Sequence, residues 1–144
     1  MAENNLDKLQ EIVAALSQEY NMPMPEVAIE YMWTTEDMGG YAYEGIGKII
    51  LNETCFNQSE DRLLFIVAHE FKHHMQRMSG ELQNFVAHHI DWNTMVCTGI
   101  WRDEWVDIRV ENQLQYIQMP WEQDANLFAA EYVLKSRKQG RIAA

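Results

Sequence analysis

The chain is poor in the residues that staple or stiffen small proteins, with two cysteines and three prolines among 144 residues. Cys55 and Cys97 stand far apart and in no metal-binding spacing, so we expect reduced thiols and not a disulfide framework. No apolar run approaches the ~20 residues of a membrane-spanning helix, and the N-terminus lacks the basic start and apolar stretch of a secretory signal. These absences predict a cytoplasmic protein that does not enter the membrane.

Basic residues are also scarce, with 11 lysines and arginines against 22 acidic residues and a net charge of −11. Most of the surface would therefore repel phosphate groups, which argues against a nucleic-acid partner. A small basic cluster stands near the end of the chain, at Lys135, Arg137, Lys138 and Arg141. We interpret it as favourable charge in the last turn of a helix, followed by a frayed tail.

Three helices are indicated by their caps and by apolar residues at helical spacing. The first begins at Asn4 or Asn5 and ends near Tyr20, and the second begins after Ser59 and ends at Ser79 and Gly80. The third has Pro120 in its first turn. Residues 81–119 have few clear breakers, and we expect one or two further helices there.

Three short apolar stretches indicate strands, at residues 27–33, 41–43 and 48–52, with Gly39 and Gly40 as a break between the first two. The glycine turns between them favour a small, mostly antiparallel sheet with, at most, a mixed edge. The expected fold class is α+β: an N-terminal helix, this three-stranded sheet, a central helix and a C-terminal helix. At this length, residues 1–144 form a single domain in this interpretation.

The strongest motif is H-E-x-x-H, formed by His69, Glu70 and His73 within the second helix. Four residues are just over one helical turn, so both imidazoles leave the same face of the helix. One tetrahedral zinc ion can take a nitrogen from each, while Glu70 lies within reach of a metal-bound water. Two histidines and a carboxylate would also accept manganese, iron or cobalt.

Catalytic zinc needs a third protein ligand, and the sequence offers a carboxylate on another element. No third histidine stands six residues after His73, where Ser79 lies instead. We expect Glu122, in the first turn of the last helix, to be the third ligand, with Asp124 and Glu131 as alternatives. Asn126, one turn after Glu122, is expected to accept a hydrogen bond from the distal ring nitrogen of His69 or His73.

The chain resembles ImmA/IrrE-type zinc metallopeptidases over roughly residues 25–134. The resemblance is carried by residues 40–41, 48–52 and 65–73, and by the closing pattern Glu122-x-x-Ala-Asn-x-Phe-Ala-Ala of residues 122–130. It implies a minimal gluzincin-like domain whose glutamate ligand is Glu122. Two features depart from that group: Lys72 stands where glycine is common, and the long spacer between His73 and Glu122 predicts an inserted helix or lid.

Several further residues are candidates for the chemistry of a zinc hydrolase. Glu70 would take a proton from the attacking water and pass it to the leaving amine. A donor to the developing oxyanion is expected from Tyr116 first, then from His88 or His89. Tyr41 and Tyr43 are candidates for lining the cleft, whereas His74 falls off the ligand face and is expected to be structural or solvated.

The sequence therefore predicts a zinc metalloendopeptidase that cleaves a protein or peptide. An extended substrate would pair with residues 40–44 as an edge strand. Two other interpretations stay open. One is a zinc-bound regulatory or binding module with little or no peptidase activity. The other is a latent enzyme in which residues 81–119 fill the open metal position. The substrate and the oligomeric state are not fixed by the sequence.

Overall fold

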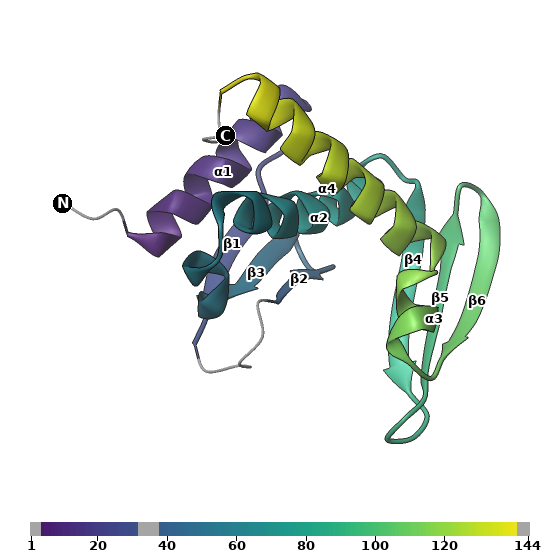
Figure 1. Cartoon of the computed structure of the whole chain (residues 1–144). Helices are drawn as coiled ribbons and strands as arrows, with labels where there is room; N and C mark the ends of the chain where they lie inside the picture. Colours follow the sequence, from purple (N-terminus) through teal and green to yellow (C-terminus); the bar gives the residue numbers. More distant parts are fainter. Residues whose placement is uncertain (1–3, 32–37, 141–144) are drawn as a thin grey trace.

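The computed structural model describes residues 4–31 and 38–140, and within these ranges the chain forms two small sheets and several helices (Figure 1). The helical elements are α1 (Asn5–Glu19), the 3-10 helix η1 (Glu53–Asn57), α2 (Glu60–Met78), α3 (Gln113–Ile117) and α4 (Pro120–Lys138). The strands are β1 (Glu26–Glu30), β2 (Gly39–Ala42), β3 (Lys48–Asn52), β4 (Leu82–His89), β5 (Met95–Trp101) and β6 (Glu104–Val110).

The helix boundaries follow the caps that the sequence predicts. The Asn4 side chain accepts a hydrogen bond from the backbone of Leu6, and the Ser59 hydroxyl accepts one from Arg62. Gly80, with φ near +80°, stands just after the end of α2. Pro120 occupies the first turn of α4, where its missing N–H costs nothing. The α+β class, the N-terminal helix and the C-terminal helix are therefore confirmed.

The first sheet has three strands in the order β1–β3–β2. β2 pairs antiparallel with β3, while β1 pairs parallel with β3. β1 is shorter than predicted, and Trp33, which closed the predicted strand, lies outside the described residues. Among the described residues β2 forms one edge of the sheet, so residues 40–42 of the predicted edge segment 40–44 lie in an edge strand.

Gly39 and Gly40 belong to β2, so the prediction that they break the chain is wrong. A side chain at Gly39 would meet Leu51 at 2.8 Å, and Glu70 and Ile66 of α2 at 3.1 Å. The glycine is needed for this close approach and not for a turn. It allows the edge strand to lie directly against the helix that carries the H-E-x-x-H motif.

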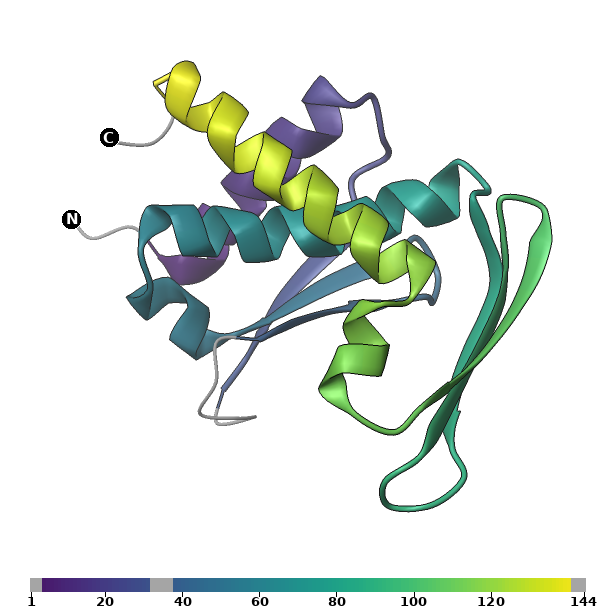
Figure 2. The same cartoon turned by 45° about the vertical axis from the view of Figure 1, so that its right-hand side comes forward.

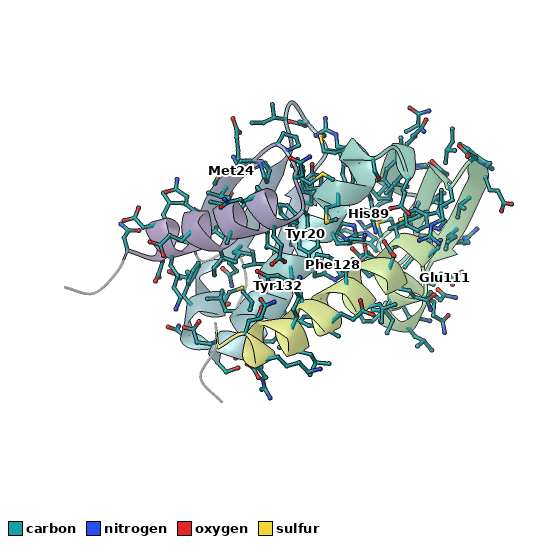
Figure 3. All side chains as sticks on the ribbon, turned by 90° about the horizontal axis from the view of Figure 1, so that it is seen from above. Tyr20, Met24, His89, Glu111, Phe128 and Tyr132 are labelled. Atoms are coloured by element: carbon teal, nitrogen blue, oxygen red, sulfur yellow. The ribbon has the colours of Figure 1, made fainter. Side chains whose placement is uncertain are left out.

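The main hydrophobic core lies between this sheet, α1, α2 and α4. α2 crosses the sheet with α1 beside it, and α4 runs over α2 on the other side (Figures 1 and 2). The fully buried side chains include Leu9 of α1, Leu51 of β3 and Phe71 of α2. Tyr20, at the end of α1, packs edge-on against Phe128 of α4, which stacks on Tyr132 (Figure 3).

Residues 81–119 include one short helix, α3, as predicted, but they are mainly a β-meander, which was not predicted. β4, β5 and β6 form a second antiparallel sheet, and only the short α3 is helical. This sheet stands beside the rest of the protein as a long arm, with α3 between the two (Figure 2). Its inner face packs on a second hydrophobic cluster that includes Cys97, Trp101 and Trp121.

The strands of this second sheet could not be predicted from the sequence, for two reasons. β4 is exposed on both faces over its last four residues, so it lacks the apolar alternation that identifies a strand. The tight turn between β5 and β6 is made by Arg102 and Asp103, both at positive φ, where a turn signal normally requires asparagine or glycine. The sequence therefore lacked the turn residues that would have marked the boundary between β5 and β6.

His74 fastens the edge strand to α2 and is structural, in accordance with its predicted place off the ligand face. Its ring is buried, its Nε2–H donates to the carbonyl of Pro23 at 2.6 Å, and its Nδ1 accepts from the Tyr41 hydroxyl at 2.7 Å. Burial lowers the pKa of His74, which suits a neutral ring with these two bonds. Tyr41 is thus occupied by His74 and does not line the cleft, contrary to its suggested role.

The helices and the two cysteines can be compared with the predictions about the membrane and about disulfides. No helix in the described ranges is long and apolar enough to span a membrane. Cys55 and Cys97 are both buried and form no disulfide within the described part of the chain, as predicted.

Candidate metal centre

Three side chains from two helices meet at one point. His69 and His73 lie one turn apart on α2, and Glu122 comes from the first turn of α4. The Nε2 of His69 lies 3.1 Å from one carboxylate oxygen of Glu122, and the Nε2 of His73 lies 2.9 Å from the other. The three potential ligand atoms all lie within 4.8 Å of one another. The structure thus brings together the three residues that the sequence predicts as ligands.

The charges of this cluster are strongly coupled. Burial opposes ionisation of Glu122, but hydrogen bonds from His69 and His73 outweigh it and lower the pKa of the carboxyl to about 2. Burial likewise opposes a charge on His73, yet its bond to Glu122 raises the pKa of the ring to about 9. A carboxylate with only 5% of its surface exposed requires positive charge beside it, whether that charge is protons or a metal ion.

The donor set matches a divalent metal ion. Ligand atoms bound tetrahedrally to one zinc at about 2.1 Å lie roughly 3.4 Å from each other, which is close to the observed spacing of the nitrogen and oxygen atoms. Two imidazoles and one carboxylate leave a fourth position open. Within the described ranges, no other histidine, cysteine, aspartate or glutamate joins the group. His69, His73 and Glu122 can therefore bind a metal ion.

Glu70 lies beside the cluster and is almost completely buried. Burial raises the pKa of Glu70, and the neighbouring His73 and His69 act in the opposite direction. It lines the same cavity as His69 and Glu122, with a volume of about 210 Å³. This cavity is lined by α2, by Gly39 of β2, by Tyr116 and Ile117 of α3, and by Glu122 and Asn126 of α4. The cavity opens to solvent, so a second molecule can reach the cluster.

Gln76 orients His73, a role that the sequence analysis assigned to Asn126. The amide oxygen of Gln76 accepts a hydrogen bond from the Nδ1–H of His73 at 2.9 Å. The amide nitrogen of Gln76 donates to the carbonyl of Trp121 at 2.9 Å and to Asp124 at 3.0 Å. This fully buried side chain therefore fixes the ring of His73 and ties it to the start of α4.

Asn126 lines the cavity, but no hydrogen bond to either histidine is found for it among the described residues, so the predicted role is not observed. The Nδ1 of His69 is buried and has no hydrogen-bond partner among the described residues. Gln76 could have been found from its spacing, since it lies three residues after His73 and hence on the same helix face. No signal identified its partners on α4.

Asp124 and Glu131, the alternative ligands, are not part of the cluster. Asp124 instead accepts from Gln76 and lies 3.8 Å from the ammonium of Lys72 and 3.5 Å from the guanidinium of Arg102. Glu131 is on the exposed face of α4. Lys72 also lies over the ring of Phe128, with its Nζ 5.2 Å from the ring centroid. Its side chain is thus committed to α4 and does not enter the cavity.

The candidate oxyanion donors separate clearly. Tyr116 is half-buried and lines the cavity with Glu70 and Glu122. Burial and these two negative charges raise the pKa of Tyr116, so its phenol keeps its proton at neutral pH. The pKa of Tyr43 is raised in the same way, but Tyr43 does not line this cavity, contrary to its suggested role, and its ring packs on Phe85. His88 and His89 are exposed on β4 and do not line this cavity.

Comparisons with protein families, with curated proteins and with solved structures gave no match to this chain.

Removing the Gln76 amide should weaken metal binding. We expect Gln76→Leu to lower the zinc affinity by about 10- to 100-fold, because the His73 ring loses the acceptor that fixes its orientation. Competition with a chelator measures this affinity, and the melting temperature of the metal-free protein reports any general damage. The matched control is Asn126→Leu, which removes an amide from the cavity wall but no bond to a histidine. Equal losses in both variants would contradict the assignment of Gln76.

Proposed function

We propose that this protein is a zinc-dependent metalloendopeptidase that hydrolyses a bond in a protein or peptide. The observation that carries the proposal is the meeting of the H-E-x-x-H histidines of α2 with Glu122 of α4, next to a buried but accessible Glu70. Two histidines, a carboxylate and one open position form the ligand set of catalytic zinc, whereas structural zinc sites fill all four positions. The buried thiols and the net charge of −11 support a cytoplasmic enzyme with a polypeptide substrate and not a nucleic acid.

Glu70 is the general base in this proposal. Zinc, when bound, lowers the pKa of a coordinated water toward about 7 and polarises the substrate carbonyl. The carboxylate of Glu70 accepts a proton from the attacking water, while a new C–O bond forms at the carbonyl carbon. When the C–N bond breaks, Glu70 delivers that proton to the leaving amine. Its position in the cavity beside His69 and Glu122 supports both transfers.

Tyr116 is the proposed donor to the oxyanion. Its phenol faces the same cavity from α3, and its raised pKa keeps the hydrogen available for donation. A preorganised donor of this kind stabilises the negative charge that develops on the carbonyl oxygen as water adds. α3 belongs to the segment 81–119, so this segment supplies one wall of the cleft.

The edge strand β2 is the proposed binding site for the substrate backbone. An extended peptide can add to the free edge of β2 as a further strand, with main-chain hydrogen bonds supplying affinity. Gly39 places this edge against Glu70, so a peptide paired with it passes over the cluster. The resemblance to ImmA/IrrE-type metallopeptidases agrees with this arrangement, although the β4–β6 arm is an addition to the minimal pattern.

Two alternatives to an active peptidase predict different observations. A zinc-bound regulatory module would need metal for folding or partner binding but would cleave nothing. A latent enzyme would fill the open position with a side chain from residues 81–119. The described residues place no histidine, cysteine, aspartate or glutamate of that segment in the cluster, which favours an open site. We therefore retain the regulatory module as the second candidate.

Substituting Glu70 separates metal binding from catalysis. We expect Glu70→Gln to retain one zinc per chain and to lower kcat by about 10²- to 10⁴-fold, because the amide cannot accept the proton of water. Hydrolysis of unfolded casein or of a peptide library, read by mass spectrometry, measures the rate. Cleavage by the variant at the wild-type rate would refute the mechanism. Absence of cleavage by the metal-loaded wild type on every substrate would favour the regulatory module.

Substituting Tyr116 tests the oxyanion donor. We expect Tyr116→Phe to lower kcat by about 10²- to 10³-fold with little change in KM, since the hydroxyl acts on the transition state more than on the bound substrate. Tyr43→Phe is the matched control, because Tyr43 is also a buried phenol near Glu70 and Glu122. A similar kcat for Tyr116→Phe and wild type would remove Tyr116 from the mechanism.

A further inference from the structure

Large apolar side chains are exposed together on the arm and on α3. Trp92, in the turn between β4 and β5, is 99% exposed, and Ile90 beside it is 53% exposed. Leu114 and Ile117 of α3 are 60% and 40% exposed. We call these four residues the tip surface. Grouped apolar side chains of this size mark interaction sites more often than single exposed residues do.

The tip surface is continuous with the metal cleft. Ile117 lines the cleft itself, and a second cavity of about 240 Å³ lies on the other side of Tyr116. Tyr116 and Gln113 belong to the walls of both cavities. The second cavity is also lined by the apolar residues Trp92, Met95 and Val110 and by the polar residues His89, Asn93, Glu111 and Asn112. His89 and Trp92 then lead into a third hollow, at the turn of the arm. A chain that leaves the cleft past Tyr116 therefore meets a path along the arm that offers both apolar and polar side chains.

The charge of this region favours a basic partner. Residues 81–119 hold six carboxylates and two arginines, a net charge of −4, within a chain whose net charge is −11. Asp91 adjoins Trp92 at the turn, and Glu111, whose carboxylate lies 3.3 Å from the guanidinium of Arg109, lines the cavity beyond Tyr116. Such a field attracts positive charge and repels acidic polypeptides.

We propose that the tip surface docks the part of the polypeptide substrate that extends from the metal cleft past α3, and that this part combines apolar and basic side chains. The inference rests on the proposed peptidase function and adds a substrate class to it. Trp92 is the anchor: a rigid aromatic side chain of this kind gains a large contact area at a small entropic cost. Catalysis then takes place at the cluster on α2 and α4, while the arm selects the substrate.

The test uses the full-length, zinc-loaded Glu70→Gln variant, which binds a substrate without cleaving it. The probe is a fluorescein-labelled 20-residue peptide of leucine, lysine and serine, which reaches about 66 Å when extended. Matched peptides carry glutamate for lysine, or serine for leucine. We expect Trp92→Ser to raise the Kd of the leucine–lysine peptide about tenfold, measured by fluorescence anisotropy. Both matched peptides should bind at least about tenfold more weakly.

Trp105→Ser is the control variant. Trp105 is also exposed, at 65%, but it alternates with the inward-facing residues of β6 and lies on the outer face of the same sheet. Its substitution should change the Kd by less than about twofold. Equal effects of the two tryptophans, or equal binding of the glutamate peptide, would overturn the proposal. A dimer seen by sedimentation and lost in Trp92→Ser would assign the surface to a second copy of the chain, which also overturns it.

These experiments distinguish failure of the proposed docking surface from failure of the proposed peptidase function. If the peptide binds through Trp92 but the metal-loaded wild type cleaves no peptide, the docking surface stands and the peptidase function fails. If the wild type cleaves both the 20-residue peptide and a five-residue peptide, and Trp92→Ser leaves both KM values unchanged, the peptidase stands and the docking surface fails. A higher KM in Trp92→Ser for the long peptide alone supports both.

Discussion

The contact between Glu122 and the two histidines of α2 is the interaction on which the rest of the site depends. It places a carboxylate inside the protein, where an unpaired charge would cost several kcal/mol, and it therefore fixes α4 against α2 at this point. Ala125 and Ala129, fully buried and one turn apart on α4, allow the two helices to approach closely. The side chains that can bind a metal ion and the packing that orders the fold thus come from the same pair of helices.

A chain of polar contacts extends this centre to the arm. His73 is held by Gln76, Gln76 by Asp124, and Asp124 by Arg102 in the turn between β5 and β6. Arg102 also donates to Glu81, which precedes β4. The start of β4 and the turn between β5 and β6 are therefore both connected to Asp124 and Gln76, the residues that hold His73. α3, which follows β6, can in this way keep Tyr116 at a fixed place in the cavity.

The sequence was sufficient for the parts of the structure with local signals. Asn4, Ser59 and Pro120 marked helix starts, and the spacing of His69 and His73 implied one shared face. Glu122 was predicted because a carboxylate ligand was expected on another element and Glu122 stands in the first turn of the last helix. The second sheet and the bonds from Gln76 to α4 were not predicted because they depend on contacts between distant segments. The bond between Gln76 and His73 is local, and it was missed although the two residues are three apart on one helix. Arg102 and Asp103 at positive φ, and a β4 strand exposed on both faces, leave no local pattern to recognise.

The most direct test of this account is the metal content of the purified protein, measured by inductively coupled plasma mass spectrometry on wild type and on Glu122→Ala in parallel. The account predicts about one zinc per wild-type chain and loss of most of it in the variant, because two histidines alone bind catalytic zinc weakly. Near-zero metal in the wild type that added zinc does not restore would contradict it. The proposed peptidase function would then have no chemical basis in this site.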